Sequence, residues 1–472
     1  MVGIVSYGAY IPIYRLKREE LSRVWAEAPQ SGEKAVANFD EDSITLAVEA
    51  GVDCLNDTPR DQVEALYFAT TNPPYKEKLS ASIIAAALDL RGELFSADFA
   101  TSIRGGTMAL RTAMDAINAG SSKNALVVAA DCRTAAPNSE SEHIFGDGGA
   151  ALLLGKDNVA VKILDSLNLT SEFMDFWRTQ ADRFNRTWED RFITEEGYQK
   201  ILPEAVKKLM QRNKLTPKDI HRAVFYAPDA RRHQAMARIL GFDPNTQVQD
   251  PLLGAVGNTG AASVLMALVA ALEDAKAGQK ILLANYGDGA DVFLLETTEL
   301  VEKIKDRRAI KKHLAAKMAL PSYGKYIKFR ALMEWEAERR DPDRSALTVL
   351  WRERNQVWRA HGNKCKACGT IQFPIQRICG KCHAKDNYEE VRLSGEKGKL
   401  FTFSMDERAV VADLPNVMSI VDFDNGGRFY CILTDRDPAK IEINMPVELT
   451  FRNLHDGSGI HNYYWKARPV RC

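Results

Sequence analysis

The sequence lacks several features that would place it in a class at once. No run approaches the roughly 18 consecutive apolar residues of a membrane-spanning helix, so we expect no such helix. Neither charge dominates, because Lys and Arg total 63 and Asp and Glu also total 63. We therefore expect no general affinity for nucleic acid or for an anionic membrane. The first residues also lack the basic start and long apolar core of a signal peptide.

Cysteine is scarce and unevenly placed. Of the 8 cysteines, four form two close pairs and the others are scattered. Close pairs suit a metal in a reducing compartment better than a disulfide framework, so we expect a cytoplasmic protein with a bound metal. A G-x-G-x-x-G fingerprint at a strand–helix turn is also missing, because Gly146-Asp147-Gly148 is not part of one. A dinucleotide site is therefore not expected.

The first 300 residues alternate between short apolar runs and longer helical stretches. The apolar runs at 65–71, 124–132 and 280–287 are bounded by turn residues. Helical stretches such as 107–120 and 262–278 lie between them. This alternation predicts a mainly parallel sheet covered by helices.

The same region carries an internal duplication. In the first half, a turn at Gly105 and Gly106 opens an alanine-rich helix, and a Phe-Gly-Asp-Gly turn follows at 145–148. In the second half, a turn at 257–260 opens a similar helix, and Tyr-Gly-Asp-Gly follows at 286–289. We predict two copies of one pattern, with both alanine-rich helices buried all round at the centre of a layered fold.

The rest of the chain divides into three parts. Residues 301–360 are charged and amphipathic with a helical period, which predicts a helical connector with a solvated face. Residues 361–395 hold the cysteine pairs. Residues 396–472 show short alternating runs around the turn Asn425-Gly426-Gly427, which predict the hairpins of a small barrel.

The cysteine pairs have the spacing of a metal site. Cys365 and Cys368 enclose two residues, ten residues follow, and Cys379 and Cys382 repeat the first spacing. Four thiolates in this pattern favour one tetrahedral zinc ion. Since all four positions are cysteine, no coordination position is left for water. We predict a structural zinc rather than a catalytic one.

The segment KCKACGTIQFPIQRICGKC at 364–382 resembles the rubredoxin-like ribbon of zinc-ribbon/OB-fold proteins that accompany thiolase-like enzymes. The resemblance extends over roughly 325–472 and implies that an OB barrel follows the ribbon. It also implies a module that docks on a condensing enzyme and helps to bind or pass acyl-CoA. OB folds elsewhere bind single-stranded nucleic acid, but the balanced charge argues against nucleic acid here.

Residues 1–300 resemble the thiolase superfamily, and within it the short enzymes akin to hydroxymethylglutaryl-CoA synthase. The resemblance implies a duplicated α/β/α/β/α layered fold and a coenzyme A thioester as substrate. It also implies a homodimer through the large domain, and it leaves room for a thiolase-like partner subunit. It rests on SADFATSIRGGTMAL (96–110), FGDGGAALLL (145–154), VGNTGAAS (256–263), NYGDG (285–289) and a substrate-flanking stretch at 171–192.

The resemblance also implies a catalytic Cys, His and Glu, and this sequence lacks all three. Ile103 stands at the position of the Cys, at the start of a helix where a thiol would be activated. Tyr226 stands at the position of the His, and Thr71 at that of the Glu. Asn258, which in the family helps to position the thioester carbonyl, is present.

Three interpretations stay open. In the first, the protein forms or cleaves a carbon–carbon bond of an acyl-CoA as an aldolase- or lyase-type enzyme. Tyr226 would then act as acid/base. Asn258 and the backbone N–H groups around Gly105 and Gly106 would hold a thioester enolate, with Ser102 also near the substrate.

The second interpretation keeps acyl transfer but with another nucleophile or base. The candidates are Ser102, Cys132, His143 and His233, although an ordinary structural role suits each. In the third, the protein is a catalytically degenerate subunit that binds acyl-CoA or supports an active partner.

Overall fold

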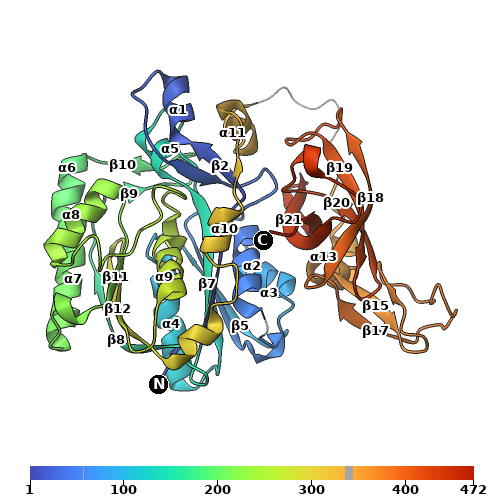
Figure 1. Ribbon diagram of the computed structural model, residues 1–472, viewed down its shortest axis with the longest axis horizontal. Coiled ribbons are helices and arrows are strands. Elements are labelled where there is room, and N and C mark those ends of the chain that lie inside the picture. The colour runs from blue at the N-terminus through green and yellow to red at the C-terminus, as the bar shows by residue number, and fades with distance from the viewer. Residues whose placement is uncertain (57, 335–343, 472) are drawn as a thin grey trace. The chain divides into compact units, whose positions relative to one another are not determined.

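A computed structural model describes residues 1–56, 58–334 and 344–471 (Figure 1). The chain forms two units. The first comprises Met1–Ala37, Asp42–Ala85 and Leu90–Arg330, and the second Asn38–Glu41, Ala86–Asp89 and Ala331–Cys472. The second unit thus includes two short segments from the first part of the chain. The predicted boundaries at residues 300, 360 and 395 stay predictions.

One nine-stranded sheet organises the first unit, with the strand order β11-β12-β13-β8-β1-β7-β6-β4-β5. The run β4-β6-β7-β1 repeats as β11-β12-β13-β8, with one parallel pairing followed by two antiparallel pairings in each. This repeat confirms the predicted duplication. The prediction of a mainly parallel sheet is wrong, because five of the eight strand pairings in this sheet are antiparallel. The strands are β1 (Gly3–Tyr10), β4 (Ala65–Thr70), β5 (Phe95–Ala100), β6 (Ala125–Cys132), β7 (Asp147–Gly155), β8 (Val161–Thr170), β11 (Arg222–Phe225), β12 (Lys280–Tyr286) and β13 (Gly289–Thr297).

Helices cover this sheet in layers (Figure 1). Helix α2 (Ser43–Leu55) packs on β1, β6 and β7, and α7 (Gln199–Arg212) packs on β8, β12 and β13. Helices α4 (Gly105–Ala119) and α9 (Ser263–Asp274) contact each other, and α9 reaches strands of both halves. The layered α/β/α/β/α fold is therefore confirmed.

The two central helices differ in burial. Helix α9 is buried all round over 264–272, as its alanine-rich sequence predicts. Helix α4 is buried on one face only. Its other face is exposed to solvent, and Arg111 and Asp115 form an ion pair there. The prediction of full burial is thus correct for α9 and wrong for α4.

Smaller elements complete the first unit. Helix α8 (Ala230–Leu240) begins after Asp229, whose carboxylate accepts a hydrogen bond from the Arg232 amide. The other elements are β2 (Tyr14–Lys17), α1 (Arg18–Trp25), β3 (Glu33–Val36), η1 (Arg60–Gln62), α3 (Ser80–Ala87), α5 (Glu140–Ile144), β9 (Phe176–Trp177), β10 (Arg186–Thr187), α6 (Asp190–Phe192), η2 (Ile193–Tyr198), η3 (Pro217–Asp219) and η4 (Gly260–Ala262).

The described part of the region predicted as a helical connector forms short helices and one short strand. They are η5 (Glu299–Ile304), α10 (Lys311–Ala315), β14 (Met318–Ala319), α11 (Tyr323–Phe329), α12 (Leu347–Arg352) and α13 (Arg354–Arg359). Pro321 separates β14 from α11, and Tyr323, Tyr326 and Phe329 are buried on α11. Part of this prediction, residues 335–343, lies outside the described residues.

The second unit holds a three-stranded ribbon and a five-stranded barrel. The ribbon order is β16-β15-β17 and the barrel order is β20-β19-β18-β21-β22. A parallel bridge between Leu433 and Ala467 closes the barrel. The strands are β15 (His361–Cys365), β16 (Ile371–Gln372), β17 (Tyr388–Arg392), β18 (Lys397–Asp406), β19 (Asn416–Phe423), β20 (Arg428–Ile432), β21 (Pro446–Gly457) and β22 (Ile460–Pro469), with η6 (Pro438–Lys440) between β20 and β21.

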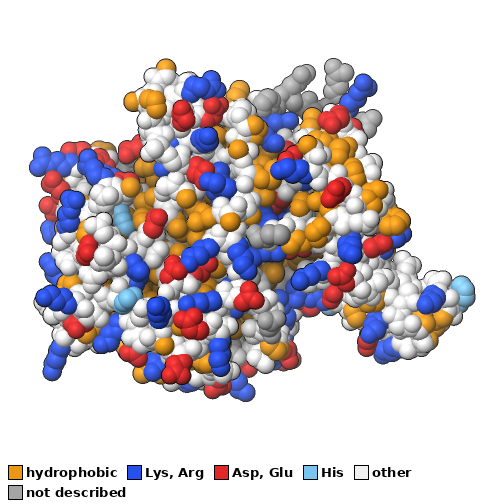
Figure 2. All heavy atoms as spheres, in the orientation of Figure 1, with side chains coloured by type: hydrophobic (Ala, Val, Ile, Leu, Met, Phe, Trp, Pro, Cys, Tyr) orange, Lys and Arg blue, Asp and Glu red, His pale blue; other side chains and the backbone are white. Residues whose placement is uncertain are grey.

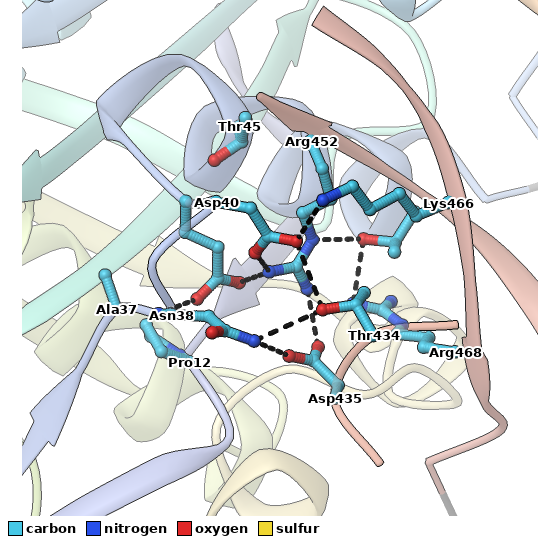
Figure 3. Close-up of polar contacts among 12 residues, drawn as sticks. Pro12, Ala37, Asn38, Asp40, Thr45, Thr434, Asp435, Arg452, Lys466 and Arg468 are labelled. Carbon is cyan, nitrogen blue, oxygen red and sulfur yellow. Dashed lines mark hydrogen bonds and ion pairs between the residues drawn. The ribbon is translucent and has the colours of Figure 1, made fainter. Parts of the chain in front are cut away.

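Charged side chains fill part of this unit's interior (Figure 3). The Arg452 guanidinium is fully buried, with carboxylate oxygens of Asp40, Glu41 and Asp435 at 3.2, 2.7 and 2.5 Å. Lys466 lies 2.8 Å from Asp40. Burial raises the pKa of the Asp435 carboxyl, but the charges of nearby arginines outweigh it and hold this pKa well below its usual range. The cluster is therefore internally neutralised.

The surface agrees with the balanced composition. Figure 2 shows basic and acidic side chains interspersed over the visible face. Within the described part of the chain, no helix has the length and apolar character needed to cross a membrane.

Candidate active site

A cavity of about 240 Å³ opens in the first unit, and three of the predicted site residues line it. They are Ile103, Tyr226 and Asn258. The chain therefore brings together residues from three distant segments. The other lining residues are Arg133, Glu140, Ser141, Ile144, Phe145, Asp175, Phe176, Thr187, Trp188, Asp190, Ile193, Thr194, Tyr198, Pro228, Arg232 and Tyr286.

Ile103 reaches the cavity from a strained turn. Thr101 has φ 81°, a left-handed conformation that is unfavourable for a β-branched residue. The turn carries the chain from β5 into α4 and presents Ile103 just before the helix begins. Gly287 lies opposite, and a Cβ there would fall 2.6 Å from Ile103 Cγ1. Ile103, which the resemblance predicts at the nucleophile position, thus offers the cavity only an apolar side chain.

Tyr226 and Asn258 are hydrogen-bonded to each other. Asn258 Nδ2 donates to Tyr226 Oη at 3.0 Å, while Asn258 Oδ1 accepts from Arg133 Nη1 at 2.9 Å. Gly260 N also donates to Asn258 Oδ1, at 3.0 Å. The Asn258 amide therefore connects Tyr226 with Arg133. Burial raises the pKa of the Tyr226 phenol, with only partial compensation from Arg133 and Asn258, so the hydroxyl keeps its proton.

Arg133 is a functional candidate that the sequence did not reveal. It follows β6 directly, and its side chain is 6% exposed at the cavity. The guanidinium carbon lies 3.5 Å from the centroid of the Phe145 ring and 5.3 Å from that of Phe176. These are cation–π contacts, and they position the guanidinium at the cavity. The only sequence signal was a charged residue immediately after a buried strand.

Asp131, two residues before Arg133, is occupied elsewhere. Its carboxylate accepts hydrogen bonds from Thr70 Oγ1 (2.7 Å), Thr71 N (2.7 Å), Thr71 Oγ1 (3.0 Å) and Ala261 N (2.8 Å). Gly260 allows this close approach, because it has φ 57° and a Cβ there would fall 2.2 Å from Asp131 Oδ2. Thr71, which stands at the family's Glu position, is thus a hydrogen-bond donor to a buried carboxylate.

Asp175 is a second candidate that the sequence did not reveal. It lies in the segment predicted to flank the substrate and lines the cavity beside Phe176. Tyr286 Oη donates to Asp175 Oδ2 at 2.7 Å. Burial raises the pKa of the Asp175 carboxyl, the Tyr286 hydrogen bond lowers it, and the charge of Asp288 raises it further. The net pKa is raised, as suits a carboxylate that exchanges a proton.

A second cavity of about 400 Å³ shares Ile103, Arg133, Asp175 and Phe176 with the first. Thr71 and Ser102 line it, and Ser102 Oγ donates to Asp288 Oδ2 at 2.8 Å. Ser102 thus belongs to this second compartment.

Gly105 and Gly106 do not line either cavity. Both are buried at the start of α4, and the Gly105 amide donates to Ser102 O at 2.9 Å. A Cβ on Gly106 would fall 2.6 Å from Ala261 O, so this glycine permits the close packing of α4 against η4. The predicted use of the Gly105 amide as an enolate donor competes with a hydrogen bond already made.

The other candidate nucleophile and bases lie away from the first cavity. Cys132 is buried and does not line it. The His233 ring packs 4.6 Å from that of Phe225, and burial lowers its pKa to about 4. His143 is buried, with Nε2 3.2 Å from a Glu27 carboxylate oxygen. These placements fit the structural roles expected for them.

The four ribbon cysteines converge as predicted. Their sulfur atoms all lie within 4.8 Å of one another, and those of Cys365 and Cys382, and of Cys368 and Cys379, are 3.6 Å apart. A tetrahedral zinc with bonds of about 2.3 Å has ligand–ligand edges of about 3.8 Å. The donor set fits zinc in both chemistry and size, and it would hold together turns that have little apolar core.

The fold and the cavity define a thiolase-like condensing-enzyme domain followed by a zinc ribbon and an OB barrel. The family model for 3-oxoacyl-[acyl-carrier-protein (ACP)] synthase III matches residues 97–171, and the model for its C-terminal part matches 210–293. The models for the ChsH2 rubredoxin-like zinc ribbon domain and the ChsH2 C-terminal OB-fold domain match 362–389 and 390–452.

Relatives specify the family of the large domain. The chain is 33% identical over 346 residues to a hydroxymethylglutaryl-CoA synthase of Methanopyrus kandleri, covering 71% of this chain and 98% of the relative. It is 34% identical over 342 residues to that of Methanocaldococcus jannaschii, covering 70% of this chain and 99% of the relative. The chain belongs to the hydroxymethylglutaryl-CoA synthase family.

Solved structures confirm the fold. A crystal structure of an HMG-CoA synthase complexed with CoA superposes with a TM-score of 0.65 at 20% identity, covering 73% of this chain and 93% of that one. PksG, an HMG-CoA synthase from Bacillus subtilis, superposes with a TM-score of 0.62 at 20% identity, covering 70% and 89%.

Proposed function

We propose that the protein forms or cleaves a carbon–carbon bond of an acyl-CoA thioester by aldol-type chemistry, without an acyl-enzyme. The observation that carries this proposal is Ile103, an apolar side chain at the cavity where the family's nucleophile would stand. Among the residues that the structure describes, no cysteine lines either cavity. Acyl transfer through a cysteine is therefore disfavoured, whereas aldol chemistry needs only a base and donors for an enolate.

In the cleavage direction, the substrate is a β-hydroxyacyl-CoA. Asp175 accepts the β-hydroxyl proton, and the bond between the α and β carbons breaks. The bonding electron pair passes into the thioester, which becomes an enolate, and an aldehyde or ketone leaves. Protonation of the α carbon then gives the shortened acyl-CoA. Condensation is the reverse sequence.

Tyr226 and Asn258 have different parts in this proposal. The Tyr226 hydroxyl accepts from Asn258 Nδ2, so its own proton is available to a substrate oxygen. A raised phenol pKa suits a hydrogen-bond donor better than a base. Asn258 is a positioning residue, because its amide is committed to Tyr226, Arg133 and Gly260.

The proposal is tested with a panel of β-hydroxyacyl-CoA thioesters. We expect release of an aldehyde or ketone together with a shortened acyl-CoA, and no mass increase of the intact chain. A covalent acyl adduct on the chain would contradict the proposal, and its position would identify the nucleophile. Tyr226→Phe is expected to lower kcat by about 10²-fold; unchanged turnover would remove Tyr226 from the proton transfers.

A second, non-catalytic function is also consistent with the residues at the family's three catalytic positions. Ile103, Thr71 and Tyr226 leave all three of the family's catalytic positions without a charged group at neutral pH. Such a chain could bind acyl-CoA in support of an active partner. Tight binding of acyl-CoA without turnover of any thioester in the panel would favour this scaffold function.

A further inference from the structure

Arg133 is a buried cation without a counter-ion at its side. Within the described residues its guanidinium makes one hydrogen bond, from Nη1 to Asn258 Oδ1, and no carboxylate lies within ion-pair distance. The remaining nitrogen atoms, Nε and Nη2, donate to no described residue and are not enclosed by protein. Arg133 lines both cavities, so we infer that these donors are available there to a ligand.

This arrangement is costly unless a ligand completes it. Burying a cation without a partner is unfavourable, and burial lowers the pKa of Arg133 because the charged form is desolvated. The nearest acid along the chain, Asp131, already accepts four hydrogen bonds from Thr70, Thr71 and Ala261. An arginine nevertheless stays protonated in proteins. No carboxylate of the described residues therefore pairs with the Arg133 guanidinium.

The other arginine at the first cavity is in a different state. Arg232 is paired with both Asp190 and Asp229, so its charge is neutralised by protein groups. Arg133 instead packs against the rings of Phe145 and Phe176, which contact its guanidinium without neutralising its charge. Of these two cations, only Arg133 has no carboxylate partner among the described residues, and it can pair with a negative charge that develops in the cavity.

We propose that Arg133 is a catalytic residue that stabilises the thioester enolate formed in the cavity. The proposal rests on the proposed function for the origin of that enolate. When the bond between the α and β carbons breaks, the electron pair moves onto the thioester oxygen, and the guanidinium donates hydrogen bonds to that oxygen. Tyr226 and Asn258 hold the same cavity wall, and no proton leaves Arg133 in the step.

A probe that forms an enolate without turnover tests this role in the full-length protein. Acetoacetyl-CoA is a β-ketothioester whose enolate absorbs in the near ultraviolet. We expect the wild-type protein to lower the pKa of bound acetoacetyl-CoA by about 1–3 units relative to the free thioester, as a neighbouring opposite charge does. Arg133→Met, which keeps the length but removes the charge, is expected to abolish this shift, and Arg133→Lys to retain part of it.

Three further measurements make the outcome decisive. The urea midpoint of Arg133→Met is expected to equal or exceed that of the wild type, because an unpaired buried charge is removed. The dissociation constant for acetyl-CoA is expected to stay within about threefold, and kcat on a turned-over β-hydroxyacyl-CoA to fall about 10²–10³-fold. Arg232→Met is the matched control and is expected to keep the enolate shift.

The failures are distinguishable. If Arg133→Met keeps the enolate shift, the proposed role of Arg133 is wrong, even when the protein turns over a β-hydroxyacyl-CoA. A uniform loss of acetyl-CoA affinity in this variant, with the shift unchanged, would make Arg133 a contact for the resting thioester or its phosphates and also overturns the proposal. If no thioester is turned over but the shift is present and depends on Arg133, the proposed function fails and the role of Arg133 stands.

Discussion

Two buried arginines occupy opposite electrostatic situations in the two units. Arg452 in the barrel unit has three carboxylates within 3.2 Å, those of Asp40, Glu41 and Asp435. The Arg133 guanidinium at the cavity has an amide oxygen as its only hydrogen-bond partner among the described residues. Since an unpaired buried cation is costly, a protein retains one where a ligand supplies the anion. We therefore assign the Arg452 charge to stabilising the fold and the Arg133 charge to binding a negatively charged group in the cavity.

The same contrast holds for acidic and thiol groups. In the second unit the four ribbon thiols converge on one point and suit one cation. At the cavity, Asp175 has a tyrosine hydroxyl as its side-chain donor and a raised pKa. The Arg452 cluster is thus satisfied by its own charges and the ribbon thiols suit a metal, whereas Arg133 and Asp175 at the cavity are left partly open. The following changes test this contrast from its strongest consequence to its weakest.

Loss of a ribbon ligand is expected to have the largest effect. Elemental analysis should find one zinc per chain, and Cys379→Ser should lose it. Because structural zinc contributes about 10–16 kcal/mol to folding in small zinc domains, the amides of β15 and β17 should lose protection in hydrogen exchange. The amides of β6 and β7 in the first unit should keep theirs. Cys431→Ala, at a buried cysteine of the barrel, serves as control and should retain zinc; zinc retained by Cys379→Ser would refute the four-ligand site.

Arg452→Met should have the next largest effect. It removes the cation that three buried carboxylates share, although Lys466 still pairs with Asp40 and Arg471 with Asp435, and breaking such a cluster costs about 3–5 kcal/mol. Urea unfolding followed by hydrogen exchange of β21 and β22 measures the loss. Arg428→Met removes an exposed pair with Asp422 in the same barrel and should lower the urea midpoint far less, because exposed ion pairs contribute little to stability. Equal losses for the two variants would mean that burial does not distinguish these charges.

Asp175→Asn tests the open carboxylate of the cavity. If Asp175 accepts the β-hydroxyl proton, kcat/KM falls as the pH drops through its raised pKa, because the protonated carboxyl cannot act as a base. The asparagine variant should lower kcat by about 10²–10³-fold and lose this acid limb.

Tyr286→Phe sharpens this test. It removes a hydrogen bond that lowers the Asp175 pKa, so the acid limb should move to higher pH while the maximal rate is kept. The side chains that act on the Asp175 pKa are Tyr286, through its hydrogen bond, and Asp288, through its charge. An acid limb that persists in Asp175→Asn would assign the titration to another group.

How far the sequence predicts these features depends on whether the signal is local. The strand–helix alternation, the duplicated turns and the cysteine spacing are local patterns, and the structure confirms all three. The resemblance also named Ile103, Tyr226 and Asn258, which do line one cavity. The helical period of the connector is likewise a local pattern, and the described part of this region forms short helices, with Pro321 just before one of them.

Arg133 and Asp175 could not be predicted, since their character depends on distant partners. Arg133 is unpaired because Asp131 is engaged by Thr71 and by Ala261, 130 residues away along the chain. Asp175 is held by Tyr286, 111 residues away. A sequence shows which charges are present but not which of them find a counter-charge after folding. That distribution is the property that distinguishes the cavity from the barrel interior.

His361 offers the weakest test, at the edge of the ribbon. Its Nδ1 lies 3.0 Å from Glu390 and its Nε2 lies 3.0 Å from Asp89, both in the second unit. Burial lowers the pKa of His361, but the hydrogen bonds and charges of the two carboxylates outweigh it, so the pKa is raised overall. Because the folded-state pKa is raised, protonated His361 stabilises the unit. This stabilisation is fully present below the unfolded-state pKa of about 6.5 and is lost as the pH rises through the folded-state pKa.

The expected contribution is about 1 kcal/mol or less, because the group is partly screened by solvent. Urea midpoints of the full-length chain measured from pH 5.5 to 8.5 should fall with rising pH in the wild type, and His361→Gln should flatten that fall. His221→Gln is the control, because its pKa is lowered by partial burial and by Arg222, and it should leave the slope of the second unit unchanged. If His361→Gln keeps the full slope, the carboxylates around it are neutralised by other groups such as Arg359, which donates to Asp89 at 2.6 Å. The carboxylates around His361 would then be neutralised without the His361 proton. That result would strengthen the contrast with the unpaired charge at the cavity.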